Sequence, residues 1–425
     1  MRKLLLFSFI TLLGSVAFIA CNDEIGEEVT QKIAEPTSDY YQPYDSALAI
    51  ALRQLDACYP GTRSHIQRTV KEHYLYSPSP STRATETDPV RFHVINFENG
   101  QGFAIVSADK RTTPVYAYSP TGNIDLQEAV QNSGVGEFMK CAELYFQDEL
   151  ITGRNDPPLP WIDPADSSFI DLMIQTPVII NGVECVYRIV NVPDSTFGPL
   201  LTTKWHQRDP YNRFCPTLLN EWGDEQHCLA GCGPIAIGQI MAYHQHPSGY
   251  DSYIFNWNAI RSPSNISPSD TCKARLVSVI GNVADVSYGL NATGMGPSKI
   301  RYTFQQMGYS TSTLQQYSSS TPMKIKSNIK ACLPMVFIGY KPIAPFSGHA
   351  WDVDGYQIMA NKTIYYKAVY PYNQIVKTQT NYTQLYYHCN FGWGQNSSAN
   401  GFFLDVHENI YSDDVAYVAD ITPIN

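Results

Sequence analysis

The amino-acid sequence predicts an α+β protein with a small N-terminal unit and a larger C-terminal domain. In the first part, a strand–turn–strand pattern over 92–107 is followed by apolar residues at helical spacing over 135–150. In the second part, a helical pattern over 232–244 precedes several strand-like segments within 334–418. The length of 425 residues exceeds that of one typical domain, which agrees with this division.

The first residues carry the features of an export signal. A charged start, Met1-Arg2-Lys3, precedes an apolar run over 4–19 that is too short for a comfortable membrane span. Residues 1–20 are therefore expected to be a signal peptide of the lipoprotein type, because the run ends at Cys21 in a pattern like a bacterial lipoprotein cleavage box. A plain signal peptide cut nearby is the alternative. The expected location is the bacterial cell surface or outer membrane, with release as a mature protein also possible, and the only expected membrane contact is a lipid on Cys21.

The remaining chain divides into three stretches by composition. Residues 21–90 are predicted to form an acidic tether followed by a helical segment and a Pro/Ser/Thr-rich linker. Residues 91–190 contain the strand–helix unit and a second linker, which begins with the proline-rich run at 155–160. Residues 191–425 form the C-terminal domain, and no internal repeat is visible in it.

Charge and cysteine usage exclude several classes of protein. The formal net charge is −10 and no basic run occurs, so no nucleic-acid partner is expected. The ten cysteines have irregular spacing in a long chain, which does not indicate a disulfide scaffold. Cys215 and Cys228 flank a loop-like segment and are a candidate disulfide pair, since export permits disulfides.

Metal binding is the competing interpretation of several of these residues. Cys228 and Cys232 form a Cys-x3-Cys pair, and His244 and His246 follow on the same stretch. Nothing in the sequence completes a ligand set, so structural roles are favoured and neither a metal nor another cofactor is expected.

Cys232 is the candidate nucleophile. Pro234 stands where the first helical residues belong, which places Cys232 at a helix N-terminus. Unpaired N–H groups and the helix dipole stabilise a thiolate there, and Gly231 leaves room for a substrate carbonyl. For a lone cysteine, a small buried core residue is the simpler interpretation, so the assignment depends on partners elsewhere in the chain.

Three residues of the right chemical types occur at other positions. His349 begins a strand-like segment and supplies an imidazole that lowers a thiol pKa and later protonates a leaving amine. Asn390 ends a later strand and supplies a carboxamide that orients such an imidazole. Gln207 supplies a side-chain N–H that, with the backbone N–H of Cys232, can hold an oxyanion.

The motifs around these residues are more specific than the residues alone. They are, in chain order, Trp205-x-Gln207-x-x-Pro210-Tyr211-Asn212; Gly231-Cys232 with Gln239-Ile240-Met241-x-Tyr243-His244; Gly348-His349-Ala350 with Asp354-Gly355; and His388-x-Asn390-x-Gly392-Trp393-Gly394. This set resembles the streptopain family, secreted bacterial cysteine endopeptidases of the papain-like clan, from about residue 200 to the C-terminus. Upstream, Gly102 to Asp109 and the strand–helix unit resemble the inhibitory pro-domain of such enzymes.

The resemblance implies a fold and a set of roles. The fold is a papain-like cysteine peptidase domain, with a helical part bearing the cysteine and an antiparallel sheet bearing the histidine, preceded by a small α+β pro-domain. Cys232 is then the nucleophile, His349 the general base and acid, Gln207 an oxyanion-hole residue and Asn390 the residue that orients His349. Gly231, Gly348 and Trp393 are expected to shape the substrate-binding site.

The function implied is that of a secreted or surface-anchored zymogen endopeptidase. Its expected partners are protein or peptide substrates and its own propeptide, which inhibits it until a cut between about residues 165 and 198. The alternative is a catalytically silent papain-like surface protein that acts as a binding or adhesion module.

Three departures from the family pattern concern the site itself. Gly233-Pro234-Ile235-Ala236 follows the cysteine where Val-Ala-Thr-Ala is usual, and Phe391 replaces a Trp. Asp352 stands where an apolar strand residue is usual, and its carboxylate is expected to disturb packing or raise the pKa of the imidazole. None of these changes removes a catalytic group.

Overall fold

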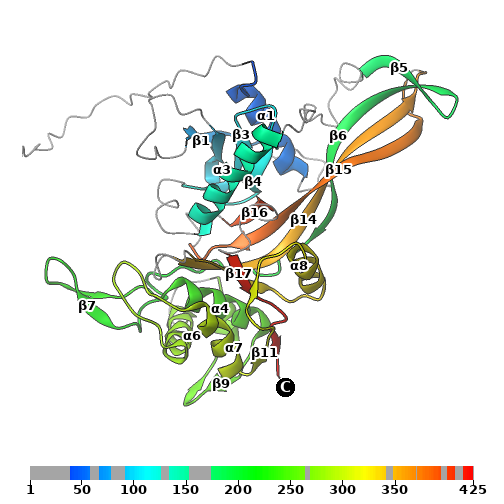
Figure 1. Cartoon of the computed structure of the whole chain (residues 1–425). Coiled ribbons are helices and arrows are strands. Elements are labelled where there is room, and N and C mark those ends of the chain that lie inside the picture. Colours follow the sequence, from blue (N-terminus) through cyan, green and yellow to red (C-terminus); the bar gives the residue numbers. More distant parts are fainter. Residues whose placement is uncertain are drawn as a thin grey trace, which may run out of the picture. The chain divides into compact units, whose positions relative to one another are not determined.

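In the computed structural model, one β-sheet runs through both predicted parts of the chain (Figure 1). The structure describes residues 39–57, 67–77, 91–125, 134–152, 174–263, 269–340, 348–369, 371–393, 400–406 and 415–424. The predicted signal peptide, Cys21 and nearly all of the first linker therefore lie outside the described residues. Among the described residues, no helix has both the length and the apolar character needed to cross a bilayer.

The sheet follows the order β1-β2-β3-β4-β16-β15-β14-β13-β17-β12, and β6 also pairs with β14. The N-terminal strands are β1 (Val70–Tyr76), β2 (Phe92–Phe97), β3 (Phe103–Ser107) and β4 (Val115–Ser119). The others are β5 (Ile174–Ile180), β6 (Val183–Phe197), β12 (Gln315–Gln316), β13 (Met335–Tyr340), β14 (Gly348–Lys367), β15 (Ile375–Asn390), β16 (Gly401–Leu404) and β17 (Val415–Val418). Every neighbouring pair in this order is antiparallel, as predicted for the C-terminal sheet.

The helices lie on the two sides of this sheet in Figure 1. Helices α1 (Tyr44–Ala57) and α3 (Gly134–Thr152) accompany the N-terminal strands. Helices α4 (Cys232–His244), α5 (Trp257–Arg261), α6 (Ser269–Ala284), α7 (Pro297–Gln306) and α8 (Thr321–Lys330) belong to the C-terminal part. Short hairpins are formed by β7 (Thr217–Leu219) with β8 (Glu225–His227) and by β9 (Gly249–Tyr250) with β10 (Tyr253–Ile254), while β11 (Tyr309–Ser310) pairs with β18 (Thr422–Pro423). The predicted α+β class is confirmed.

The N-terminal unit forms as its sequence pattern predicts. β2, β3 and β4 are buried along their whole length, because α1 and α3 pack on them. Asn99 adopts a left-handed conformation (φ 55°) at the turn between β2 and β3, which an Asn tolerates better than most residues. The predicted helix over 135–150 is confirmed as part of α3.

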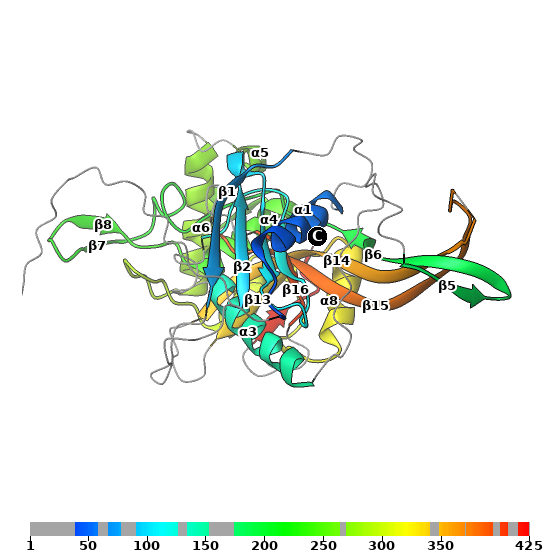
Figure 2. The same ribbon diagram turned by 90° about the horizontal axis from the view of Figure 1, so that it is seen from above.

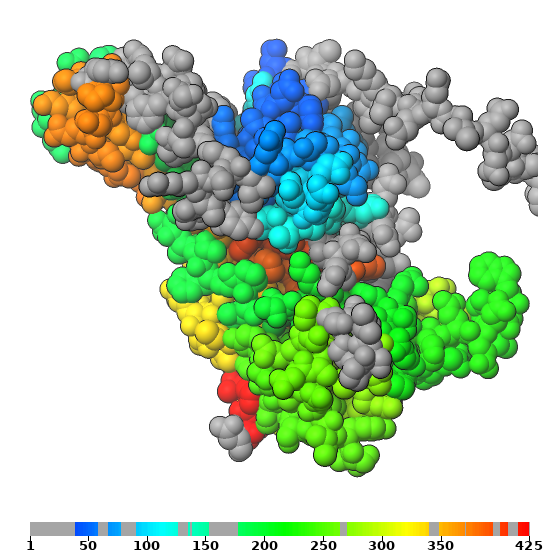
Figure 3. All heavy atoms as spheres, turned by 180° about the vertical axis from the view of Figure 1, so that it is seen from behind, coloured from blue at the N-terminus to red at the C-terminus, as the bar shows by residue number. Residues whose placement is uncertain are grey.

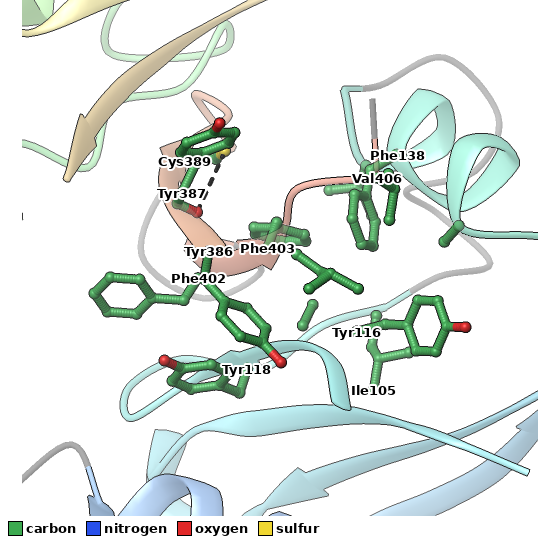
Figure 4. Close-up of a cluster of buried hydrophobic side chains, with 14 of the residues drawn as sticks. Ile105, Tyr116, Tyr118, Phe138, Tyr386, Tyr387, Cys389, Phe402, Phe403 and Val406 are labelled. Atoms are coloured by element: carbon green, nitrogen blue, oxygen red, sulfur yellow. Dashed lines mark hydrogen bonds between the residues drawn. The ribbon is translucent and has the colours of Figure 1, made fainter. Parts of the chain in front are cut away.

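The N-terminal unit joins the C-terminal sheet through β4 and β16. Phe402 pairs with Tyr118 and Phe403 with Ala117 across this junction. The rings of Tyr118 and Phe402 stack with centroids 5.4 Å apart, and Phe138 of α3 meets Phe403 edge-to-face at 4.8 Å (Figure 4). Figure 3 shows the blue and cyan N-terminal residues packed against orange-red strands of the C-terminal sheet. One apolar core therefore spans both parts.

A long β-arm departs from the predicted organisation. β6 pairs with β14 from Cys185 to Phe197, and β5 pairs with β6 at its outer end. β5, β6, β14 and β15 extend together beyond the rest of the sheet (Figure 2). β6 is a single strand that crosses the predicted boundary between residues 190 and 191, so the chain has no linker at that point.

Candidate active site

Cys232 lies at the first position of α4. Every residue from Gly233 to Ala242 is buried, because this apolar helix is enclosed by other helices and by the sheet. Gly231 precedes it with a φ of 93°, a conformation that L side chains rarely adopt. A Cβ on Gly231 would also approach Cγ2 of Thr293 to 3.0 Å. Glycine is therefore required at this turn by both backbone conformation and space.

Helix α4 packs against β14, and this packing places His349 next to Cys232. The backbone N–H of Ala350 donates to Sγ of Cys232 at 3.4 Å. Burial by itself raises the pKa of the Cys232 thiol. The charge of the His349 imidazole, its hydrogen bond to the sulfur and the N–H groups of Ala350 and Gly233 together hold that pKa below its ordinary value. The predicted nucleophile and base are thus in direct contact.

The imidazole of His349 is held on its other side by a backbone carbonyl. Nε2 lies 2.9 Å from the oxygen of Phe391, and a carbonyl can only accept, so Nε2 carries the hydrogen. This leaves Nδ1 to exchange a proton with the thiol. The ring of Trp393 stacks on the imidazole at 6.2 Å between centroids, and that of Phe391 lies at 6.4 Å.

Asn390 does not make the contact that was predicted for it. Its Nδ2 donates to the carbonyl of Thr203 at 2.9 Å and to Oε1 of Gln239 at 3.2 Å, and its Oδ1 accepts from the N–H of Gly392 at 3.2 Å. The hydrogen bonds of the Asn390 amide therefore go to other groups than the imidazole. In the sheet, Asn390 is paired with Asp352, three residues beyond His349 on β14. The atom that orients His349 belongs instead to the next residue, Phe391, and a backbone carbonyl leaves no signal in the sequence.

Gln207 lies beside the loop that leads to Cys232. Its carbonyl accepts from the N–H of Ala230 at 2.9 Å, two residues before Cys232. Its side chain is half-buried. Gly348 begins β14 opposite Tyr340 of β13 and is exposed. The structure thus gathers Gln207, Gly231, Cys232, Gly348, His349, Asn390 and Trp393 into one region.

Asp352 is fully buried, and its environment differs from the expected one. Burial, and secondly the charge of Asp354, raise its pKa well above the ordinary value, although a hydrogen bond from Gln239 opposes this. This shift favours the neutral form of the Asp352 carboxyl group, which weakens the electrostatic effect on His349 that the sequence predicts.

Cys215, Cys228 and His246, which the sequence offered for a disulfide or a metal site, have structural environments. Cys215 and Cys228 are both free thiols, so the candidate disulfide between them is not formed. Burial raises the pKa of Cys215 to about 11, although a hydrogen bond from Tyr288 opposes this, and the raised pKa makes this thiol a poor nucleophile. His246 Nε2 lies 3.0 Å from the carbonyl of Gly308. Within the described ranges no group of three or more His, Cys, Asp or Glu residues is placed to hold a metal ion.

Comparison with known proteins agrees with this geometry. Residues 205–403 match the sequence model of the peptidase C10 family, and residues 31–145 match that of the Spi protease inhibitor. Streptopain of Streptococcus pyogenes is 24% identical over 350 residues, covering 73% of each chain. The thiol protease/hemagglutinin PrtT of Porphyromonas gingivalis is 23% identical over 391 residues, covering 82% of this chain and 39% of PrtT. Among solved structures, prointerpain A of Prevotella intermedia covers 82% of this chain and 98% of its own, with 16% identity and a TM-score of 0.48.

Proposed function

Since this chain is a cysteine peptidase of the C10 family with an N-terminal inhibitor-like region, we propose that it hydrolyses peptide bonds through a Cys232 thiolate paired with His349. The observation that carries this proposal is the contact between the two side chains, which holds the thiol pKa below its ordinary value. A thiolate at neutral pH is the form that attacks a carbonyl.

The reaction follows from the positions of the groups. Sγ of Cys232 attacks the scissile carbonyl carbon, and the carbonyl oxygen takes the negative charge. The backbone N–H of Cys232 and the side chain of Gln207 stabilise this oxyanion, a contribution of about 10²–10³ in rate for one such donor. His349 then gives its Nδ1 proton to the leaving amine, and a water molecule, deprotonated by the same nitrogen, hydrolyses the acyl-enzyme. Phe391 holds the ring in the tautomer this requires, with Trp393 stacked over it.

We propose that the N-terminal unit keeps this enzyme inactive until it is removed. Supporting observations are its match to an inhibitor family and its place as a continuation of the catalytic sheet through β4 and β16. A cavity of about 680 Å³ is lined by Asn99–Gly100 and Thr121–Asn123 of the N-terminal unit and by Thr202–Trp205 of the C-terminal part. A tethered inhibitor occupies its site at high effective concentration, and cleavage makes the contact bimolecular.

The position of the activating cut follows from strand pairing. β6 is hydrogen-bonded to β14 over most of its length, and Leu200 and Leu201 donate backbone N–H groups to Asp354. A strand held by hydrogen bonds resists cleavage, so we place the cut outside β5 and β6, N-terminal to Ile174 and within 153–173. The β5–β6 hairpin then stays with the mature enzyme. Export of the chain, with lipidation at Cys21, is part of the same proposal and rests on the sequence.

An active-site label tests the function directly. Because the N-terminal unit is proposed to occupy the site, the processed protein is treated with a thiol-alkylating peptide probe at neutral pH, and the modified residue is identified by peptide mapping. Labelling at Cys232, with loss of proteolysis in Cys232→Ala and its retention in Cys228→Ala, is the expected result. If Cys232 is not labelled, the result would instead support a catalytically silent binding module.

A further inference from the structure

The helix that carries Cys232 meets the strand that carries His349 at two polar contacts. The first is the catalytic one, where Ala350 N–H donates to Sγ of Cys232 at 3.4 Å. The second lies two helical turns further along α4, where Nε2 of Gln239 donates to Oδ2 of Asp352 at 3.1 Å. Ala350 and Asp352 are two residues apart on β14 and so lie on the same face of the strand. The two contacts therefore fix α4 along β14 at two separate points.

The amide of Gln239 also reaches the other segments of the site. Its Oε1 accepts from Nδ2 of Asn390 at 3.2 Å and from the backbone N–H of Trp205 at 3.2 Å. Asn390 directly precedes Phe391, whose carbonyl holds His349, and Trp205 lies two residues before Gln207. A backbone N–H can only donate, so the atom facing Trp205 is the oxygen, and the orientation of the amide is determined.

One fully buried side chain thus touches each segment that carries a site residue. Gln239 has 0% exposure, and its oxygen uses both lone pairs. An unpaired amide in such a place is strongly destabilising, so the segments cannot shift without breaking a bond that water does not replace. The mechanism described above gives Gln239 no chemical step, because it does not contact the dyad.

We propose that Gln239 is a positioning residue that sets the spacing between the Cys232 thiol and the His349 imidazole. Through Asp352 it fixes the strand that carries His349, and through Asn390 it fixes the carbonyl that orients the ring. Asp352 serves as the acceptor on the strand, a role that an apolar residue at that position cannot fill. The inference rests on the proposed roles of Cys232 and His349.

The test compares Gln239→Leu with Gln357→Leu as a matched control. Gln357 is an equally buried amide on the same strand β14, but its Nε2 donates to Thr196 and its Oε1 accepts from Tyr118, away from the dyad. Two quantities are measured on each protein after processing: the rate of Cys232 alkylation by iodoacetamide against pH, and kcat and KM for a short peptide.

Gln239→Leu is expected to lower kcat by about tenfold to a hundredfold with little change in KM, as misplacement by about 1 Å does in enzymes. The alkylation profile should move to higher pH, because a displaced imidazole no longer stabilises the thiolate. Gln357→Leu should keep the profile of the parent protein. If Gln239→Leu has the parent's kcat and the parent's profile, the inference is wrong.

A double variant decides the case if the single variant does not fold. In Gln239→Leu with Asp352→Val both members of the pair become apolar, which generally restores much of the lost stability. A stable double variant with a shifted alkylation profile supports positioning, whereas one with the parent's profile assigns Gln239 a purely structural role. If Cys232 fails to react in the parent protein, the proposed function fails instead, so the two results are distinguishable.

Discussion

The hydroxyl of Tyr118 in the N-terminal unit donates a hydrogen bond to Oε1 of Gln357 in the catalytic sheet. Both side chains are buried, and the Gln357 amide also donates to Thr196 of β6 at 2.8 Å. The bond therefore crosses the junction between β4 and β16 and fixes the two parts side by side. Two further side-chain hydrogen bonds join the same parts: Nε2 of Gln384 donates to Oγ1 of Thr113, and the hydroxyl of Tyr386 donates to the carbonyl of Val115.

Tyr118→Phe should weaken the inhibitory contact without unfolding either part. The variant keeps the ring that stacks on Phe402 and loses only the hydroxyl, a net loss of about 0.5–1.5 kcal/mol. The N-terminal unit added in trans should then inhibit the mature enzyme about two- to tenfold less well. The measurement is the inhibition constant, with Tyr74→Phe, whose hydroxyl bonds Ile124 within the N-terminal unit, as control. Equal inhibition constants would contradict the role given to Tyr118.

His349→Ala should make the thiol less reactive near neutral pH. The imidazole lowers the pKa of Cys232, so its removal raises that pKa and reduces the thiolate fraction at pH 6–7. The rate of alkylation against pH in the full-length protein shows the change as a shift of the inflection to higher pH. An unshifted inflection would mean that no ion pair exists.

Asp352→Asn should change the pH dependence of stability. The pKa of Asp352 is raised in the folded protein above its unfolded value of about 3.9, so its contribution is fully present below pH ~4 and is lost as pH rises toward the folded pKa. Asn cannot ionise and still accepts from Gln239. The variant should be about as stable as the parent near pH 4 and progressively more stable than the parent above that pH.

Urea unfolding at several pH values, in an inactive Cys232→Ala background, measures this difference. For one titrating group, the difference in unfolding free energy between variant and parent cannot change by more than about 1.4 kcal/mol per pH unit. Asp194→Asn, with a side chain that is 49% exposed and paired with Lys362, is the surface control for the substitution itself. A flat difference for Asp352→Asn would show that its carboxyl group is ionised in the folded protein.

Gly231→Ala should reduce activity more than its effect on stability explains. The positive φ of Gly231 costs an alanine about 1–3 kcal/mol, and the new methyl group also meets Thr293. Gly182→Ala is the matched control, since Gly182 has a φ of 79° at the β5–β6 turn with nothing within 4 Å. Both variants should have a lower melting temperature than the parent, but only Gly231→Ala should have a lower kcat. Similar kcat values would mean that the turn does not position Cys232.

Maturation should leave the β5–β6 hairpin on the active enzyme. N-terminal sequencing of the processed protein is expected to give a start between 153 and 174. A start after residue 183 would require cleavage within a strand paired on both sides near its outer end, and it would contradict the proposed cut.

Much of the fold and the order of the site residues could be predicted from local patterns. The helix beginning at Cys232 and the strand beginning at His349 are visible in apolar spacing and in the Gly348-His349 motif. The β4–β16 junction could not be predicted, because Tyr118 and Gln357 are 239 positions apart and no local pattern relates them.

Two features of the structure have no signal in the sequence, for physical reasons. β6 follows a proline-rich stretch that predicts a linker, yet β14 pairs with it along the sheet, with a bulge next to Pro193. The carbonyl of Phe391 bonds to His349, and a backbone carbonyl cannot be identified from residue types. Only the three-dimensional structure relates Gln239 to Asp352, since they are 113 positions apart and no local pattern joins the two segments.

Removal of the N-terminal unit uncovers the outer edge of β16. Phe402 and Phe403, 5% and 2% exposed in the full-length chain, then border a row of unpaired N–H and C=O groups. Such an edge invites a strand from another molecule, although a strand of four residues offers few positions for pairing. The freed enzyme is consequently expected to self-associate at concentrations at which the precursor stays monomeric, so that solubility is lost as activity is gained.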